Sequence, residues 1–248
     1  MSEVPMGSRD DVLAGGATGG TTSSPMAFPI PAEELGTVSI VPNGSFEAGS
    51  YQTFVLTYIA GKFGIDDSGS MRVCFRFASD QTRPQFEDPK GPNYTTIEAS
   101  NNAVLTYHYD PKGNVRPWDR TLYIKVVRGF LREGDKITIT FGDRSGGSPG
   151  MRLQTFCEDS YEFHTLIDPI ATYCYQPMPL QPVIKIIPGK PDRYLVVAPT
   201  IRAIDERFSI KFKGEDKWGN PSDQCDIQLY PRASHPVTGL PDVISLKP

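Results

Sequence analysis

The stretch MRVCFRFA, residues 71–78, alternates apolar and polar side chains with a period of two. In an extended strand, successive side chains point to opposite faces, so this alternation gives one apolar face and one polar face. The expected inward residues are Met71, Val73, Phe75 and Phe77, and the expected outward residues are Arg72, Cys74 and Arg76. The stretch therefore predicts a half-buried strand, with one face of its sheet packed on a core.

The same period recurs in three further stretches: YQTFVLTYIA (51–60), TLYIKVV (121–127) and KITITFG (136–142). Turn-forming residues separate these stretches, and the chain contains 23 glycines and 23 prolines. Such spacing is typical of many short strands joined by tight turns. No long window has the i, i+3, i+4, i+7 apolar spacing of an amphipathic helix. We therefore predict an all-β protein, with an antiparallel β-sandwich over residues 36–175.

The remainder of the chain divides into three parts. Residues 1–35 are rich in Gly, Ser, Thr and Ala without periodicity, which predicts a disordered N-terminal arm. A proline-rich stretch, 176–182, is typical of a linker. Residues 183–248 contain four further short apolar runs, which predict strands at 183–187, 194–197, 207–213 and 225–230. They predict a partial immunoglobulin-like β unit, because a full one needs roughly 100 residues and seven strands. A partial unit leaves a sheet edge and apolar side chains exposed between Ile187 and Ile210 and at the C-terminus.

Charge and composition limit the classes of partner. The net charge is −4 with both signs interspersed, so no electropositive surface for nucleic acid is expected. The sequence has neither the apolar core of a signal peptide nor an apolar run of the length that spans a membrane. These features predict a cytoplasmic protein with neither a nucleic-acid nor a membrane partner. The four cysteines have no CxxC spacing and are expected to be buried or free thiols.

The sequence contains no complete set of catalytic or metal-binding residues. Its three histidines, His108, His164 and His235, are widely separated and form no H-x-H or HExxH arrangement. Cys157, followed by acidic residues and His164, is the nearest approach to an activated nucleophile, but the end of a strand explains it more simply. The glycine-rich loop FGDRSGGSPG (141–150) lacks the Lys and Ser/Thr of a phosphate-binding P-loop. We therefore assign no catalytic residue, no metal ligand and no cofactor.

Two long loops carry the residue types that favour binding. Residues 83–94 and 110–120 combine Arg, Asp, Tyr and Trp outside the strand pattern. Tyrosine, tryptophan and arginine are enriched at contact sites, because each offers a large area with a polar end. Candidate ligand or interface residues are Tyr94, Arg116 and Trp118, together with Asp143 and Arg144 at the tip of the glycine-rich loop. Packing of loop aromatics over the end of the sandwich is the alternative interpretation.

Four long stretches occur in an order that is typical of one bacterial family. They are FEAGSYQTFVLTYIAGKFGIDDSGSMRVCFRFASD (46–80), YDPKGNVRPWDRTLYIKVVRGFLREGDKITITFGD (109–143), GSPGMRLQTFCED (147–159) and EDKWGNPSD (215–223). Over residues 37–240 the chain resembles the N-terminal region of the domain-of-unknown-function 3604 family. The resemblance implies that such proteins continue into a metallohydrolase-like module of the polymerase-and-histidinol-phosphatase type. No residue of this chain matches the metal ligands of that module.

Three functions follow as hypotheses. The first is a non-catalytic accessory or scaffold β module of a larger metal-dependent hydrolase-like protein, present as a fragment or split subunit. Its partner would be the hydrolase-like module or subunit, with a second copy of the chain as a further partner. The alternative is an independent protein that binds a small molecule or sugar through the loops of Tyr94, Arg116 and Trp118. The third, a hydrolase that uses Cys157 or a carboxylate-bound metal, has the least support.

Overall fold

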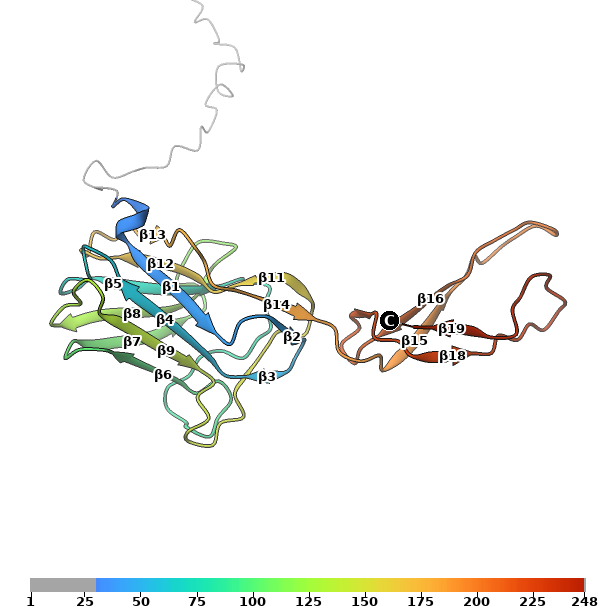
Figure 1. The fold of residues 1–248 in the computed structure, drawn as a ribbon, viewed down its shortest axis with the longest axis horizontal. Coiled ribbons are helices and arrows are strands. Elements are labelled where there is room, and N and C mark those ends of the chain that lie inside the picture. Colours follow the sequence, from blue (N-terminus) through green and yellow to red (C-terminus); the bar gives the residue numbers. More distant parts are fainter. Residues whose placement is uncertain (1–29, 248) are drawn as a thin grey trace, which may run out of the picture.

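A computed structural model describes residues 30–247, and the fold it shows is all-β (Figure 1). Two main sheets have the strand orders β1-β4-β9-β6 and β13-β12-β5-β8-β7, and they pack as the two layers of a sandwich. The strand bounds are β1 Gly36–Val41, β2 Ser45–Glu47, β3 Tyr51–Gln52, β4 Phe54–Ala60, β5 Ser70–Phe75, β6 Thr95–Ala99, β7 Val104–Asp110, β8 Arg120–Arg128, β9 Lys136–Phe141, β10 Met151–Arg152, β11 Glu158–Glu162, β12 His164–Asp168, β13 Gln176–Pro177, β14 Val183–Ile187, β15 Arg193–Val197, β16 Lys211–Glu215, β17 Pro221–Ser222, β18 Ile227–Leu229 and β19 Ile244–Leu246.

The alternating stretches supply the core of this sandwich, as the period of two predicts. The inward residues of β4, β5, β8 and β9 are buried. They are Phe54, Leu56, Tyr58, Met71, Val73, Phe75, Leu122, Ile124, Val126, Ile137, Ile139 and Phe141. Aromatic rings join the two layers: Phe163 lies between β11 and β12, and its ring centroid is 5.6 Å from Phe75 and 5.7 Å from Phe141.

Phe77 departs from the predicted face. Strand β5 ends at Phe75, and the chain turns at Phe77, so the period of two stops before that residue. The side chain of Phe77 is 45% exposed and carries the guanidinium of Arg116 at 4.9 Å from its ring centroid. The expectation that Phe77 faces the core is therefore wrong. Cys74, expected to face outward, is nevertheless buried, because Thr121 and Asn114 cover it.

The two ends of the sandwich differ from the predicted boundaries. Ile30 and Leu35 are buried around a short 3-10 helix, Ala32–Glu34, so the last residues of the predicted N-terminal arm belong to the core. The rest of that predicted arm, residues 1–29, lies outside the described residues.

The predicted linker also belongs to the sandwich. Strand β13 pairs with β12, and Met178 is buried in the core. Strand β14 pairs antiparallel with β11 and parallel with β2, and its inward residues Ile184 and Ile186 are buried. The sandwich therefore runs to Ile187, rather than ending at 175 with a free linker over 176–182. The remaining residues, 188–247, are called the C-terminal segment below.

The C-terminal segment forms a three-stranded sheet, β15-β16-β17, and a two-stranded sheet, β18-β19. Figure 1 shows these strands projecting from the end of the sandwich that carries β2, β3 and β14. Two of the predicted strands are shorter than expected: 207–213 becomes β16, which begins at Lys211, and 225–230 becomes β18. The all-β class holds for this part too.

The turn between β16 and β17 fastens the C-terminal segment to the sandwich. The carboxylate of Asp216 is buried and accepts hydrogen bonds from the backbone N–H groups of Gly189 (3.1 Å), Trp218 (2.9 Å) and Asn220 (2.9 Å). The side-chain amide of Asn220 donates to Thr155 O at 2.8 Å, and its oxygen accepts from Cys157 N at 3.1 Å. Asp216 thus shapes a turn whose next residues reach across to the sandwich.

Trp218 makes the second contact of this turn. Its indole Nε1 donates to Ala48 O at 3.0 Å. The ring covers Gly49, where φ is +68° and an added Cβ would lie 2.6 Å from the indole. Only glycine combines this left-handed backbone with so close an approach. The sequence pattern EDKWGNPSD therefore serves as an anchor on the edge of the sandwich.

Candidate functional site

Two of the predicted binding residues, Arg116 and Trp118, lie together in the loop between β7 and β8. The half-buried ring of Trp118 stacks on His164, with centroids 4.8 Å apart and planes 14° apart, and Arg76 lies 5.5 Å from the indole centroid. Arg116 is exposed and forms an ion pair with Asp119 at 3.4 Å. Both side chains therefore pack against neighbours in their own sheet layer.

A hollow of about 240 Å³ lies beside this pair, lined by Arg76, Phe77, Pro117, Phe156 and Glu158 among others. Its charges are matched internally, because Arg76 Nη1 lies 2.8 Å from Glu158 Oε1. A ligand would have to compete with that ion pair for either charge. The hollow thus offers aromatic contacts to a ligand, but the charged groups of Arg76 and Glu158 are already paired with each other.

The other three predicted residues, Tyr94, Asp143 and Arg144, hold loops together. The backbone N–H of Asp143 donates to Tyr94 O at 2.7 Å, and its carboxylate accepts from Thr96 Oγ1 and from Ser145 N, both at 2.9 Å. The hydrogen bond from the backbone N–H of Ser145 is the main cause of the lowered pKa of Asp143. Arg144 Nη2 donates to Tyr51 O at 2.9 Å. These polar groups are used within the chain, and ligand contact by them stays a prediction.

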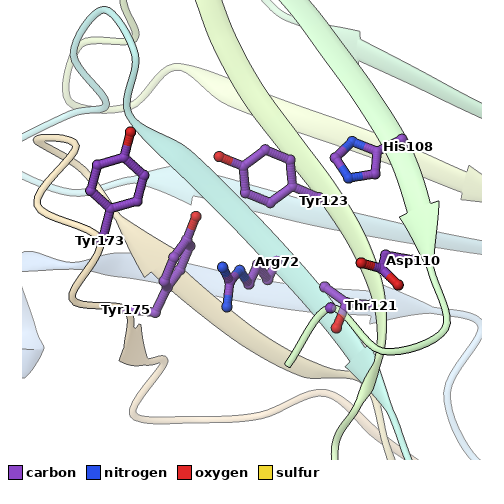
Figure 2. A pocket seen from close by; sticks show the side chains of 8 residues that line it. Arg72, His108, Asp110, Thr121, Tyr123, Tyr173 and Tyr175 are labelled. Atoms are coloured by element: carbon purple, nitrogen blue, oxygen red, sulfur yellow. The ribbon is translucent and has the colours of Figure 1, made fainter. Parts of the chain in front are cut away.

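A pocket on the outer face of the five-stranded sheet brings together residues that the sequence analysis did not select (Figure 2). It is a hollow of about 200 Å³. Its lining is made of Arg72, His108, Asp110, Gly113, Thr121, Tyr123, Tyr173 and Tyr175. This set of residues is called the Arg72 pocket below.

Strand register explains why these side chains meet. Arg72 of β5 pairs with Tyr123 of β8, and Tyr123 pairs with His108 of β7. Residues that pair directly across neighbouring strands point to the same face. Tyr173 and Tyr175 come from the loop after β12, and Figure 2 shows Tyr175 beside the Arg72 guanidinium.

The guanidinium of Arg72 is the only arginine head group in this pocket. Its carbon lies 3.7 Å from the ring centroid of Tyr175 and 5.8 Å from that of Tyr123, both within the range of cation–π attraction. Its Nη1 donates to Asn114 Oδ1 at 3.5 Å, and its Nε is buried without a hydrogen-bond partner. None of the ion pairs formed within residues 30–247 includes Arg72.

The sequence carried a partial signal for this pocket. Arg72 was placed on the outward face of its strand, but the partner of that face depends on register, which no local pattern reveals. The run ATYCYQ (171–176) places two tyrosines after a strand end. That run could have been selected by the same aromatic criterion that selected Tyr94 and Trp118.

The cysteine that came nearest to a nucleophile has the wrong electrostatics for that role. Cys157 is an exposed free thiol, in agreement with the expectation of buried or free thiols. Partial burial and the carboxylates of Asp216 and Asp159 raise the pKa of Cys157. A nucleophilic cysteine needs a lowered pKa, so the environment opposes thiolate formation.

The described part of the chain contains no cluster of three or more His, Cys, Asp or Glu side chains that could hold a metal ion. Within residues 30–247, no helix has the length and apolar character needed to cross a membrane. The chain matches no protein-family model, and no curated protein matches it.

Proposed function

We propose that this chain is a non-catalytic accessory β module that docks, through its C-terminal segment, on a metal-dependent hydrolase-like module. The observation that supports this proposal is the exposure of apolar side chains along β15 and the following loop. All five residues of β15 are exposed. Val196 is 61% exposed, Ile201 84% and Ile204 94%.

Strand β15 also offers an open sheet edge to a partner. It lies at the edge of its sheet, with β16 on one side only. An edge strand presents unpaired N–H and C=O groups that can pair with another chain, and contiguous exposed apolar area marks contact surfaces. Strand β15 also buries little of its own apolar area, because Leu195 and Val197 are exposed as well. A second β structure laid against β15 would satisfy both needs.

The anchor on the sandwich holds the exposed apolar surface of β15 in a defined position. Trp218 and Asn220 tie the turn after β16 to the edge of the sandwich, through hydrogen bonds to the backbone oxygens of Ala48 and Thr155. Strand β16 ends at Glu215, directly before that turn, and β15 pairs with β16. The exposed apolar residues of β15 are therefore attached to a fixed point. The chemistry assigned to the partner, a metallohydrolase, rests on the resemblance carried by the four ordered stretches.

The test begins with the coding sequence downstream of Pro248, read in all frames for a module with an H-x-H metal-binding segment. That module and this chain are then purified separately, and their affinity is measured by calorimetry. We expect saturable binding. The double substitution Val196→Ser and Ile204→Ser should weaken it by at least about tenfold, since a buried aliphatic side chain contributes roughly 1.5–3 kcal/mol.

Val115→Ser is the matched control, because Val115 is 78% exposed and lies in the sandwich. It should bind as the unmodified chain does. Absence of such a module, or equal binding by the double variant, would overturn the proposal. A concentration-dependent dimer of the chain alone that the double variant dissociates would assign the surface to a second copy instead.

A further inference from the structure

We infer that the Arg72 pocket is a binding site for one small carboxylate ligand, of the size and chemistry of a sugar acid. This inference is independent of the docking surface, because the pocket lies on the sandwich rather than on the C-terminal segment. It stands on the geometry of the guanidinium, the aromatic residues around it and the size of the hollow (Figure 2).

The half-buried Arg72 has few partners for its guanidinium. A guanidinium has five N–H donors and no acceptor. Arg72 makes one hydrogen bond, at the 3.5 Å limit, to Asn114, and its buried Nε makes none. Buried charged groups are normally paired, because desolvation without compensation is costly. An anion that reaches the guanidinium would supply the missing acceptors.

The arginine is held in place for such a ligand by the ring of Tyr175 and the loop that carries it. The ring of Tyr175 stacks against it, and the hydroxyl of Tyr175 lies 2.6 Å from Ser70 Oγ. The loop that carries Tyr175 is fixed by the buried carboxylate of Asp168, which accepts from Thr172 N at 2.9 Å and from Tyr173 N at 2.6 Å. A receptor that is ordered before binding loses less entropy when the ligand arrives.

The charges and the volume of the pocket favour a small ligand with a single negative charge. One guanidinium fork matches the planar carboxylate group with two parallel hydrogen bonds. The carboxylate of Asp110 also lines the pocket, which disfavours a doubly charged phosphate over a singly charged carboxylate. A volume of about 200 Å³ is below the ~300–1,000 Å³ of drug-sized ligand pockets, so a single small molecule fits.

Polar groups on aromatic and imidazole rings surround the guanidinium of Arg72. Burial raises the pKa of Tyr175 to about 12, so its hydroxyl keeps its proton at neutral pH. His108 and Tyr123, whose ring centroids lie 5.1 Å apart, also line the hollow. Hydroxyl and imidazole groups beside aromatic faces suit a ligand that has both hydroxyl groups and an apolar ring face.

The test titrates the full chain with sodium glucuronate, with glucose and with inorganic phosphate, followed by NMR of the arginine Nε–H signals. We expect saturable shifts with glucuronate, at the signal of Arg72. Glucose, which has the same ring without the carboxylate, should bind at least about tenfold more weakly, and so should phosphate. The Arg72→Lys variant should lose the same factor for glucuronate, because lysine cannot offer the planar fork.

Arg132→Lys is the control variant, because Arg132 also lies over an aromatic ring, that of Phe130, at 5.3 Å but outside this pocket. It should bind glucuronate as the unmodified chain does. The inference is overturned if glucuronate gives no saturable shift, if glucose or phosphate binds equally well, or if Arg72→Lys binds unchanged. The ligand comparison uses the unmodified chain, so it decides the matter even if Arg72→Lys fails to fold.

Discussion

Replacing Phe163 with alanine is expected to lower the free energy of unfolding by about 3–5 kcal/mol, the range for a buried aromatic residue. Its side chain is fully buried, and its ring contacts four others, those of Phe54, Phe75, Phe141 and Tyr161. Because these rings come from both layers of the sandwich, the cavity would open at the centre of the core. Urea denaturation followed by far-UV circular dichroism measures the loss.

Phe77→Ala provides the matched control for that experiment. The same residue type is removed from a position that the alternating pattern assigned to the core and the structure places half in solvent. The expected loss is below about 1 kcal/mol, mainly from the contact with Arg116. Equal losses for the two variants would contradict the assigned end of β5 at Phe75.

Replacing Asp216 with alanine is expected to release the C-terminal segment from the sandwich at a cost of about 3 kcal/mol. The change removes a buried carboxylate that accepts four hydrogen bonds and leaves their N–H donors without partners. In a Trp118→Phe background, Trp218 is the single tryptophan, because the chain contains two. Its fluorescence in urea then reports release of the turn directly.

The attachment of this turn is also expected to depend on pH, because it relies on the ionised carboxylate of Asp216. Burial by itself would raise the pKa of Asp216, but the surrounding amide donors outweigh it and hold the pKa below the ordinary value of 3.8. A lowered folded-state pKa means that the stabilisation is complete above the pKa of the unfolded state. It is lost as pH falls through the pKa of the folded state. The Trp218 signal should therefore show release only in acid below pH 4.

Asp226→Ala is the control for both experiments, since Asp226 is an exposed carboxylate of the same segment. Its stability and its acid response should equal those of the unmodified chain. Release of Trp218 at the same urea concentration in Asp216→Ala and Asp226→Ala would show that Asp216 does not hold the turn.

Local patterns predicted the sandwich because its central strands are half buried. Each of β4, β5, β8 and β9 has one face on the core, so the period of two appears in the sequence itself. The pattern failed at Phe77 because a strand end depends on the turn that follows, and the sequence does not mark the residue at which pairing stops.

The boundary after the sandwich could not be predicted in the same way. A run with prolines at 177, 179 and 182 is typical of a linker, yet it packs Met178 into the core and leads to β14. The parallel pairing of β14 with β2 joins residues far apart in the chain, and no local signal encodes such a contact. Predicted strand 183–187 was correct in extent and wrong in the unit to which it belonged.

The candidate site shows the same division. Residue types selected Trp118 and Arg116, which lie in one loop. They also selected Tyr94, Asp143 and Arg144, whose polar groups form hydrogen bonds with other parts of the chain. Arg72 was recognised as outward facing, but its meeting with Tyr123 and Tyr175 depends on register and on the path of a loop. Pockets on the face of a sheet are assembled by such nonlocal placement.

Amide hydrogen exchange of β15 tests the proposed function most directly, because it reports on the edge strand itself. In the chain alone, the amides of β15 that point away from β16 should exchange rapidly, as expected of an exposed edge strand with few buried contacts. Addition of the hydrolase-like module should slow exchange at these amides, while Thr138 of the central strand β9 stays unchanged. Slow exchange in the chain alone, or no protection on addition of the module, would contradict the account.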